Sequence, residues 1–155
     1  MTLNSSKKLT VAVFADAQNV NLFKYSQAIL NFVNNLGGMP CLYAYHHWRS
    51  ISPKKEQKLQ SQNWRCVDVP IIAKDKLDKQ LISDFDELCR FWQPDVLVLI
   101  TNDGDFATIV KSYLGTGRKV IVIGYEGKVS KKLRRLVPQG IYFAETLCQK
   151  LPIAA

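Results

Sequence analysis

Long apolar runs are missing from this sequence, and their absence limits the surroundings in which the chain can work. No apolar stretch approaches the roughly 20 residues that a helix needs to cross a bilayer. The first residues, MTLNSSKKLT, are polar and lack the apolar segment of a secretory signal. We therefore expect a cytoplasmic protein with no membrane partner.

Paired cysteines and spacer segments are missing as well. The sequence contains no C-x-x-C pair, and its cysteines stand far apart, at Cys41, Cys66, Cys89 and Cys148. We expect four reduced, mostly buried thiols rather than disulfides or a zinc site. There is also no internal repeat, low-complexity segment or linker, which predicts a single domain over residues 1–155 with a core from about residue 9 to 145.

The residues that are present are typical of a globular domain with an excess of positive charge. Hydrophobic residues make up 47% of the 155 residues and aromatic residues 10%, which is enough for an ordinary core. The formal net charge of +8 favours a polyanionic partner, with nucleic acid as the first candidate, although a basic balance also serves solubility.

Apolar and amphipathic segments alternate along the chain. Segments of strand length and composition occur at residues 9–15, 39–48, 64–72, 96–100 and 118–124, with a last short strand or turn at 140–147. Helical patterns occupy residues 21–36, 52–62, 76–92, 105–117 and 129–140. This alternation predicts an α/β fold, a three-layer sandwich around a central, mostly parallel sheet of five to six strands.

Acidic residues follow the strands at positions where a parallel sheet gathers its ligands. Asp16 follows the first predicted strand, and Asp103 and Asp105 follow the fourth. Asp78 lies in the first turn of the helix before that strand, whereas Asp84 lies nearly two turns further on. Because the carboxyl ends of parallel strands meet at one rim, we expect these acids to converge, with Asp84 the weakest candidate. Such an oxygen-only set matches Mg²⁺ or Mn²⁺.

Each of these acids also has a simpler explanation on its own. Asp16 and Asn19 can form a turn that caps the following helix, and Asp78 or Asp105 can cap the helix that it begins. Asp103 is harder to explain as a cap, because Asp105 stands beside it. The conjunction of the acids, rather than any single one, favours a metal site.

Three segments together resemble the NYN domains, part of the PIN-like ribonuclease superfamily that includes the LabA-like proteins. The segments are FADAQNVNL (residues 14–22), KDKLDKQLISD (74–84) and LITNDGDFATIVKSYLGTGRKVIVIG (99–124). The resemblance extends from about Val11 to Phe143. It implies a Rossmann-like, PIN-like fold with a Mg²⁺- or Mn²⁺-dependent nuclease centre that acts on RNA.

The resemblance also implies roles for individual residues. The catalytic and metal-binding acids of the family fall on Asp16, Asp78, Asp103 and Asp105, and Asp84 matches a supporting acid. Three positions depart from the family pattern, where Ala17, Leu77 and Asn102 replace glycine or another small residue. None of these departures removes an acid, and Asn102 can add a polar ligand.

Polar and basic residues near these motifs are the expected substrate contacts. We expect substrate binding by Asn19, Thr101, Asn102, Lys74, Lys76, Lys131 and Arg134. Lys74 and Lys76 stand close to Asp78, where they can bind a phosphate or pair with the acids. Lys131 and Arg134 belong to a dense basic cluster at residues 128–135, for which a solvated helix face is an equally good explanation.

Other lysines, histidines and aromatic residues favour structural roles. We expect Lys54, Lys55 and Lys58 to face solvent. His46 and His47 can touch a substrate but, as neighbours on a strand, point to opposite faces and do not share a metal. Four aromatic residues can stack on bases, although packing is the more ordinary role: Tyr43, Tyr45, Trp48 and Trp64.

Two functions remain open after these observations. The first is a metal-dependent ribonuclease, expected to be an endonuclease, which needs no small organic cofactor. The second is a non-catalytic RNA-binding or regulatory module, and a homodimer is open for either. A phosphotransfer enzyme is disfavoured, because Gln18 and Val69-Pro70 stand where haloacid-type hydrolases or receiver domains need aspartate.

Overall fold

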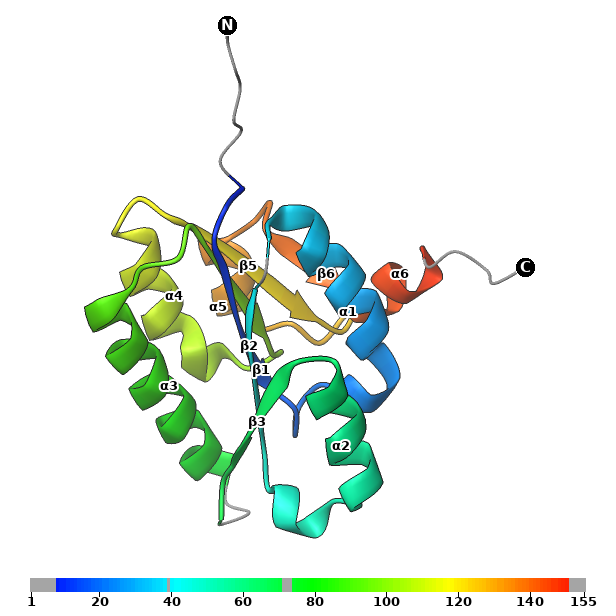
Figure 1. The fold of residues 1–155 in the computed structure, drawn as a ribbon. Coiled ribbons are helices and arrows are strands. Elements are labelled where there is room, and N and C mark those ends of the chain that lie inside the picture. Colours follow the sequence, from blue (N-terminus) through cyan, green and yellow to red (C-terminus); the bar gives the residue numbers. More distant parts are fainter. Residues whose placement is uncertain (1–7, 39, 71–73, 151–155) are drawn as a thin grey trace, which may run out of the picture.

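Six parallel strands form one sheet in the computed structural model, which describes residues 8–38, 40–70 and 74–150, with Lys74 described by its backbone alone (Figure 1). The order across the sheet is β3-β2-β1-β4-β5-β6. The strands are β1 (Val11–Asp16), β2 (Cys41–His46), β3 (Trp64–Asp68), β4 (Val96–Ile100), β5 (Lys119–Gly124) and β6 (Ile141–Phe143). The predicted α/β fold with a parallel sheet is therefore confirmed.

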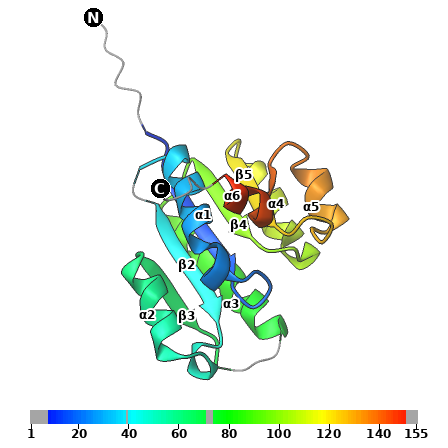
Figure 2. The same cartoon turned by 90° about the vertical axis from the view of Figure 1, so that its right-hand side faces the viewer.

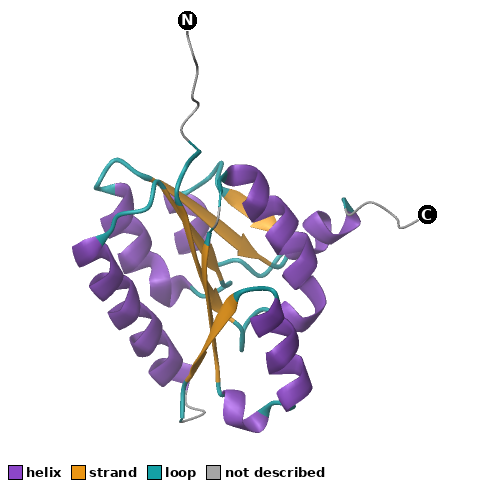
Figure 3. Ribbon diagram, viewed as in Figure 1, coloured by secondary structure: helices purple, strands orange, loops and turns teal. Residues whose placement is uncertain are grey.

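Helices cover both faces of the sheet, as Figure 3 shows. One face carries α1 (Leu22–Leu36), α2 (Pro53–Ser61) and α6 (Ala144–Gln149). The other carries α3 (Lys74–Phe91), α4 (Ala107–Leu114) and α5 (Lys131–Leu136). Because both faces are covered, β1 and β4 are buried along their whole length, which explains why their sequences are continuous apolar runs. None of the described helices is both long and apolar enough to cross a membrane.

Several element boundaries differ from those expected. The third strand was expected at 64–72, but β3 ends at Asp68. It is an edge strand of the sheet. Residues 71–73 lie outside the described part of the chain. The helix expected at 105–117 begins at Ala107 and ends at Leu114, because a separate 3₁₀ turn, η2 (Gly104–Phe106), precedes it. The segment at 140–147 contains both β6 and the start of α6.

The sheet changes its direction of growth between β1 and β4. From β1 the chain proceeds outward to β2 and β3, then returns through α3 to place β4 on the other side of β1. Figure 2 looks toward the face of the sheet that α1, α2 and α6 cover. Ligands of open parallel sheets bind at the carboxyl ends of the strands beside such a switch point. The topology therefore predicts a ligand site at the carboxyl ends of β1 and β4, beside the residues that follow Asp16 and Ile100.

The amphipathic pattern of α3 fixes how this helix faces that rim. Leu77, Leu81 and Phe85 lie on one face of the helix and are buried against the sheet. Phe91, near the end of the helix, is 85% exposed. The four cysteines are free and half-buried, which agrees with reduced thiols but shows less burial than expected.

Candidate metal centre

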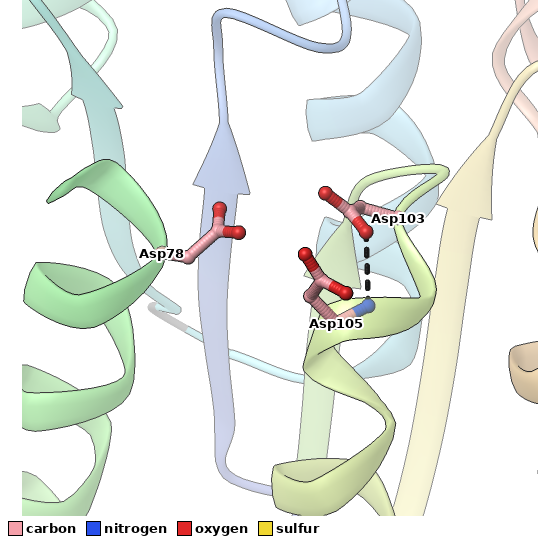
Figure 4. Close-up of side chains that lie close together, drawn as sticks. All are labelled: Asp78, Asp103 and Asp105. Carbon is pink, nitrogen blue, oxygen red and sulfur yellow. Dashed lines mark hydrogen bonds between the residues drawn. The ribbon is translucent and has the colours of Figure 1, made fainter. Parts of the chain in front are cut away.

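Three aspartates bring their carboxylates together at the carboxyl rim of the sheet. Ligand oxygens of Asp78, Asp103 and Asp105 all lie within 4.8 Å of one another. Figure 4 shows the side chains pointing toward one another, Asp78 from α3 and the other two from the segment that follows β4. Residues about 25 positions apart in the sequence thus form one acidic group, because the crossover through α3 returns to the strand beside β1.

The loop after β4 holds two of these acids in a fixed geometry. Asp103 is the N-cap of η2, and its Oδ1 accepts a hydrogen bond of 2.9 Å from the backbone N–H of Asp105. The sequence interpretation that Asp105 is the better capping residue is therefore wrong. Asp103 takes the cap because the 3₁₀ turn starts earlier than the predicted helix, and Asp105 then lies in its first turn.

The two acids of α3 have different surroundings. Asp78 is only 7% exposed and faces the other two carboxylates. Asp84 instead accepts hydrogen bonds from the buried Tyr45 hydroxyl at 2.8 Å and from Gln80 Nε2 at 2.9 Å. Asp84 therefore satisfies a polar group at the edge of the core and lies outside the acidic group.

Asp16 lies beside the acidic group rather than within it. It is the last residue of β1, is 4% exposed, and lines a pocket of 230 Å³ together with Asn19 and Asp78. Burial, followed by the carboxylate of Asp78 and with a smaller contribution from Asp103, raises the pKa of Asp16 from 3.8 to about 7. Hydrogen bonds from the Asn19 backbone and from Thr101 oppose this rise. Burial is thus the main reason why the charged form of Asp16 is disfavoured, and the neighbouring carboxylates add to it.

Thr101 connects Asp16 to the loop after β4. Its side chain is fully buried, and its Oγ1 lies 3.4 Å from Asp16 Oδ2 and 3.4 Å from Asn19 Oδ1. The same oxygen accepts a hydrogen bond of 3.1 Å from the backbone N–H of Asp103. Thr101 thus orients two of the predicted acids, and a substrate contact by this buried side chain stays a prediction.

Asn102 joins three loops of the rim. Its backbone N–H and its Nδ2 donate to Asn19 Oδ1, at 2.7 and 3.0 Å. Its Oδ1 accepts from the backbone N–H of Tyr125 at 2.7 Å, and its carbonyl accepts from the N–H of Ser130 at 2.9 Å. The residue that departs from the family pattern therefore replaces a glycine with a set of hydrogen bonds between the loops. Substrate binding by Asn19 and Asn102 stays a prediction.

This packing around Asn102 requires glycine at position 124. A Cβ atom on Gly124 would lie 2.5 Å from Asn102 Oδ1, 2.5 Å from Val129 Cγ2 and 3.0 Å from the Thr101 carbonyl oxygen. Gly124→Ala should lower the free energy of unfolding by about 1–3 kcal/mol, because buried neighbours must move to admit the methyl group. Chemical denaturation measures the loss. Gly115→Ala is the matched control, since Gly115 has helical dihedral angles (φ −61°) and its substitution should be neutral or slightly stabilising. Equal stability of Gly124→Ala and the native chain would contradict this account.

A lysine that the sequence did not single out for this role lies against the acidic turn. A Cβ on Gly104, between Asp103 and Asp105, would lie 2.5 Å from Ser130 Oγ and 3.4 Å from Lys132 Cδ. The start of α5 is therefore packed on η2. Lys131, Lys132 and Arg134 are all exposed on this short helix, and Lys132 is the one whose side chain lies beside Gly104. The adjacent lysines of the sequence do not by themselves indicate which one lies beside the turn.

The other predicted substrate residues have simpler environments. Lys76 is exposed, two positions before Asp78, and the side chain of Lys74 lies outside the described part of the structure. Trp48 and Trp64 are 3% and 2% exposed, and each donates its indole N–H to a protein oxygen. Both tryptophans therefore pack in the core. His47 Nδ1 lies 2.6 Å from the Val69 carbonyl oxygen, which ties two neighbouring loops together.

Comparisons with known proteins agree with this architecture. A family model described as NYN domain matches residues 10–144. No curated protein matches the chain. Among solved structures, the chain is similar to a protein of unknown function from Vibrio parahaemolyticus, with a TM-score of 0.72, 23% sequence identity, and coverage of 91% of this chain and 96% of the other. At that identity the likeness shows a shared fold.

Proposed function

The chain belongs to the NYN domain family, and from this premise we propose that it is a metal-dependent ribonuclease that hydrolyses phosphodiester bonds within RNA strands. The observation that carries the proposal is the convergence of the carboxylates of Asp78, Asp103 and Asp105 within 4.8 Å at the switch point of the sheet. A PIN-like nuclease fold, which the family suggests, gives this acidic group a chemical use. RNA is then the partner, the cytoplasm the place of action, and no organic cofactor is needed.

The donor set of the rim fits a divalent cation. The ligand atoms are carboxylate oxygens only, which suits Mg²⁺ or Mn²⁺ better than a metal that prefers nitrogen or sulfur. The raised pKa of Asp16 supports the same proposal, because burial first and then the carboxylates of Asp78 and Asp103 disfavour its charged form, which a bound cation would stabilise. Asp78, Asp103 and Asp105 would hold the ion, with Asp16 as a direct or water-mediated fourth ligand. Such an ion, when bound, lowers the pKa of water and neutralises charge on a phosphoryl group.

Residues of the chain itself supply the rest of the proposed chemistry. The cap from Asp103 and the hydrogen bonds of Thr101 and Asn102 keep the carboxylates in place, so little reorganisation is needed when a substrate arrives. Lys132 lies next to the acidic turn, where its ammonium group can hold an RNA phosphate. Lys76, Lys131 and Arg134 are exposed and are further candidates for contacts with RNA phosphates.

Removal of metal tests the proposal directly. Labelled single-stranded RNA of mixed sequence, incubated with the protein in Mg²⁺ or Mn²⁺, should be cut, and excess EDTA should abolish the cutting. A circular RNA of the same sequence should also be cut, because an endonuclease needs no free end. Binding of RNA without cleavage in any of these ions would favour the non-catalytic module instead. Cleavage that persists in EDTA would contradict metal dependence.

A further inference from the structure

A second pocket, with basic walls, lies between α1 and α2 on the opposite face of the sheet from α3. It encloses 310 Å³ and is lined by residues that include Phe23, Lys24, Ser26, Lys55, Lys58 and Gln62. The proposed metal chemistry uses none of these residues. The sequence favoured a purely solvent-facing role for Lys55 and Lys58, but the structure places both on the wall of this pocket.

The charge of the pocket has one sign. Its three lysines are exposed, and none of the described residues that line it is acidic. Glu56, the acidic residue of α2, is not among the residues that line the pocket. Three ammonium groups around one hollow attract a ligand with several negative charges, such as a chain of phosphates.

A hydrogen-bond chain holds a polar group in the wall of the pocket. The buried Trp64 donates its Nε1–H to Ser26 Oγ at 2.9 Å, and Ser26 donates to Gln62 Oε1 at 2.7 Å. Ser26 is itself only 4% exposed. Among the described residues, none accepts a hydrogen bond from Gln62 Nε2. The amide group is thus held by its oxygen and retains its N–H donors for a ligand.

An aromatic ring completes the pocket. Phe23 is half-buried, and its ring packs edge-on against Trp48 with centroids 5.9 Å apart. The ammonium group of Lys55 lies 5.1 Å from the centroid of the Phe23 ring. Because the ammonium group of Lys55 lies over the ring, a base that stacks there takes its place, and the displaced cation can pair with the phosphate of that nucleotide.

The pocket lies close to the acidic rim. Asp16 of β1 pairs with Tyr45 of β2, and the next residue of β2, His46, has its ring 6.4 Å from that of Phe23. Neighbouring strands are about 4.8 Å apart, so the two sites lie on the order of 15 Å from each other. Stacked nucleotides advance about 3.4 Å each, which places the pocket roughly four nucleotides from a phosphate at the acids.

We propose that the pocket between α1 and α2 is a second RNA subsite, which holds one nucleotide of a single-stranded substrate whose cleaved bond lies at the acidic rim. Lys24, Lys55 and Lys58 bind the phosphates, Phe23 stacks on the base, and Gln62 donates to a base oxygen or phosphate. The inference rests on the proposed function, because it assigns the substrate of that same site as single-stranded RNA of at least about five nucleotides.

Charge reversal in the pocket tests the subsite. A fluorescein-labelled 15-nucleotide polyuridine is titrated with protein in EDTA, so that binding is measured without cleavage. Lys55→Glu/Lys58→Glu should raise Kd at least about tenfold and reduce the slope of log Kd against log salt by roughly 1.4, since each phosphate contact to a single strand contributes about 0.7.

A matched double variant removes the effect of net charge. Lys111→Glu/Lys119→Glu makes the same change in charge at exposed positions toward the opposite end of the sheet. It should leave the salt slope unchanged and Kd within about threefold at physiological salt, where the screening length is about 8 Å. Equal effects of the two double variants on Kd and slope, or no binding by the native chain, would overturn the subsite.

Substitution of the ring gives an independent test. Phe23→Leu should raise Kd at least about fivefold, whereas Phe23→Trp should keep Kd near that of the native chain. The reason is that stacking on an aromatic ring contributes to the affinity of each base. An equal loss in both variants would overturn the stacking role. Cleavage of RNA by a protein whose pocket variants behave like the control would overturn the subsite and leave the ribonuclease standing. RNA binding that depends on the pocket, without any cleavage, would overturn the ribonuclease and leave the pocket as an RNA-binding site.

Discussion

Replacing Asp103 by asparagine is expected to lower metal-dependent RNA cleavage at least about a hundredfold while leaving the fold intact. Loss of a residue that only supports a metal ligand typically costs about 10–100-fold, and Asp103 is proposed as a ligand itself. Asparagine retains an Oδ1 atom that can accept the hydrogen bond from the Asp105 N–H, so the cap of η2 survives. The variant loses the negative charge, which is the part of the side chain that the proposed ion needs.

The measurement compares initial cleavage rates of a labelled RNA in saturating Mg²⁺ with thermal unfolding of the same samples. Asp86→Asn serves as the control, because it makes the same chemical change at an exposed position on α3 outside the acidic group. Calorimetric titration of Mg²⁺ gives a readout that does not depend on activity, and Asp103→Asn should bind the ion more weakly. Full activity of this variant, with unchanged products, would remove the acidic group from the mechanism.

The sheet and the two strands that are buried along their whole length could be predicted from sequence because their signals are local. The runs at Val11–Asp16 and Val96–Ile100 are apolar along their whole length, as strands covered on both faces must be. The convergence of Asp78 with Asp103 also followed from sequence, because the first turn of a helix that follows a parallel strand lies at the same rim as the carboxyl end of β4. This prediction needed only the position of each acid relative to the alternating strands and helices.

What could not be predicted depends on contacts between distant residues. Asn102 bonds to Tyr125, 23 positions away, and to Asn19, 83 positions away, so nothing in its neighbourhood reveals that it joins the loops. Lys132 faces the acidic turn because of how α5 packs on Gly104, whereas the sequence shows only adjacent basic residues. Phe23 likewise meets Lys55 only after α1 and α2 are placed side by side.

The metal-free protein should become more stable when Asp16 is replaced by asparagine, and more so as the pH rises. Without a cation, burial and the carboxylates of Asp78 and Asp103 raise the pKa of Asp16 from 3.8 to about 7. The folded state therefore holds a proton that the unfolded chain releases above about pH 4. The stability that this proton provides is complete below pH 3.8 and is lost as the pH rises to about 7. This difference corresponds to on the order of 4 kcal/mol, since one pKa unit is equivalent to about 1.4 kcal/mol.

Asparagine resembles the protonated carboxyl group and does not titrate, so Asp16→Asn removes this loss. Urea denaturation in EDTA should show the variant more stable than the native chain at pH 8 by about 2–4 kcal/mol, with less than half that difference at pH 5. The control Asp86→Asn makes the same chemical change at an exposed position outside the acidic group, and so measures the effect of removing one negative charge by itself. Added Mg²⁺ should stabilise the native chain more than Asp16→Asn, because a bound cation neutralises the charge that asparagine has already removed. A variant less stable than the native chain at pH 8 in EDTA would show that Asp16 is not destabilised by its neighbours. If Asp16→Asn is more stable as expected, the close packing of carboxylates at the rim destabilises the metal-free protein, and the same closeness allows the carboxylates to bind one ion.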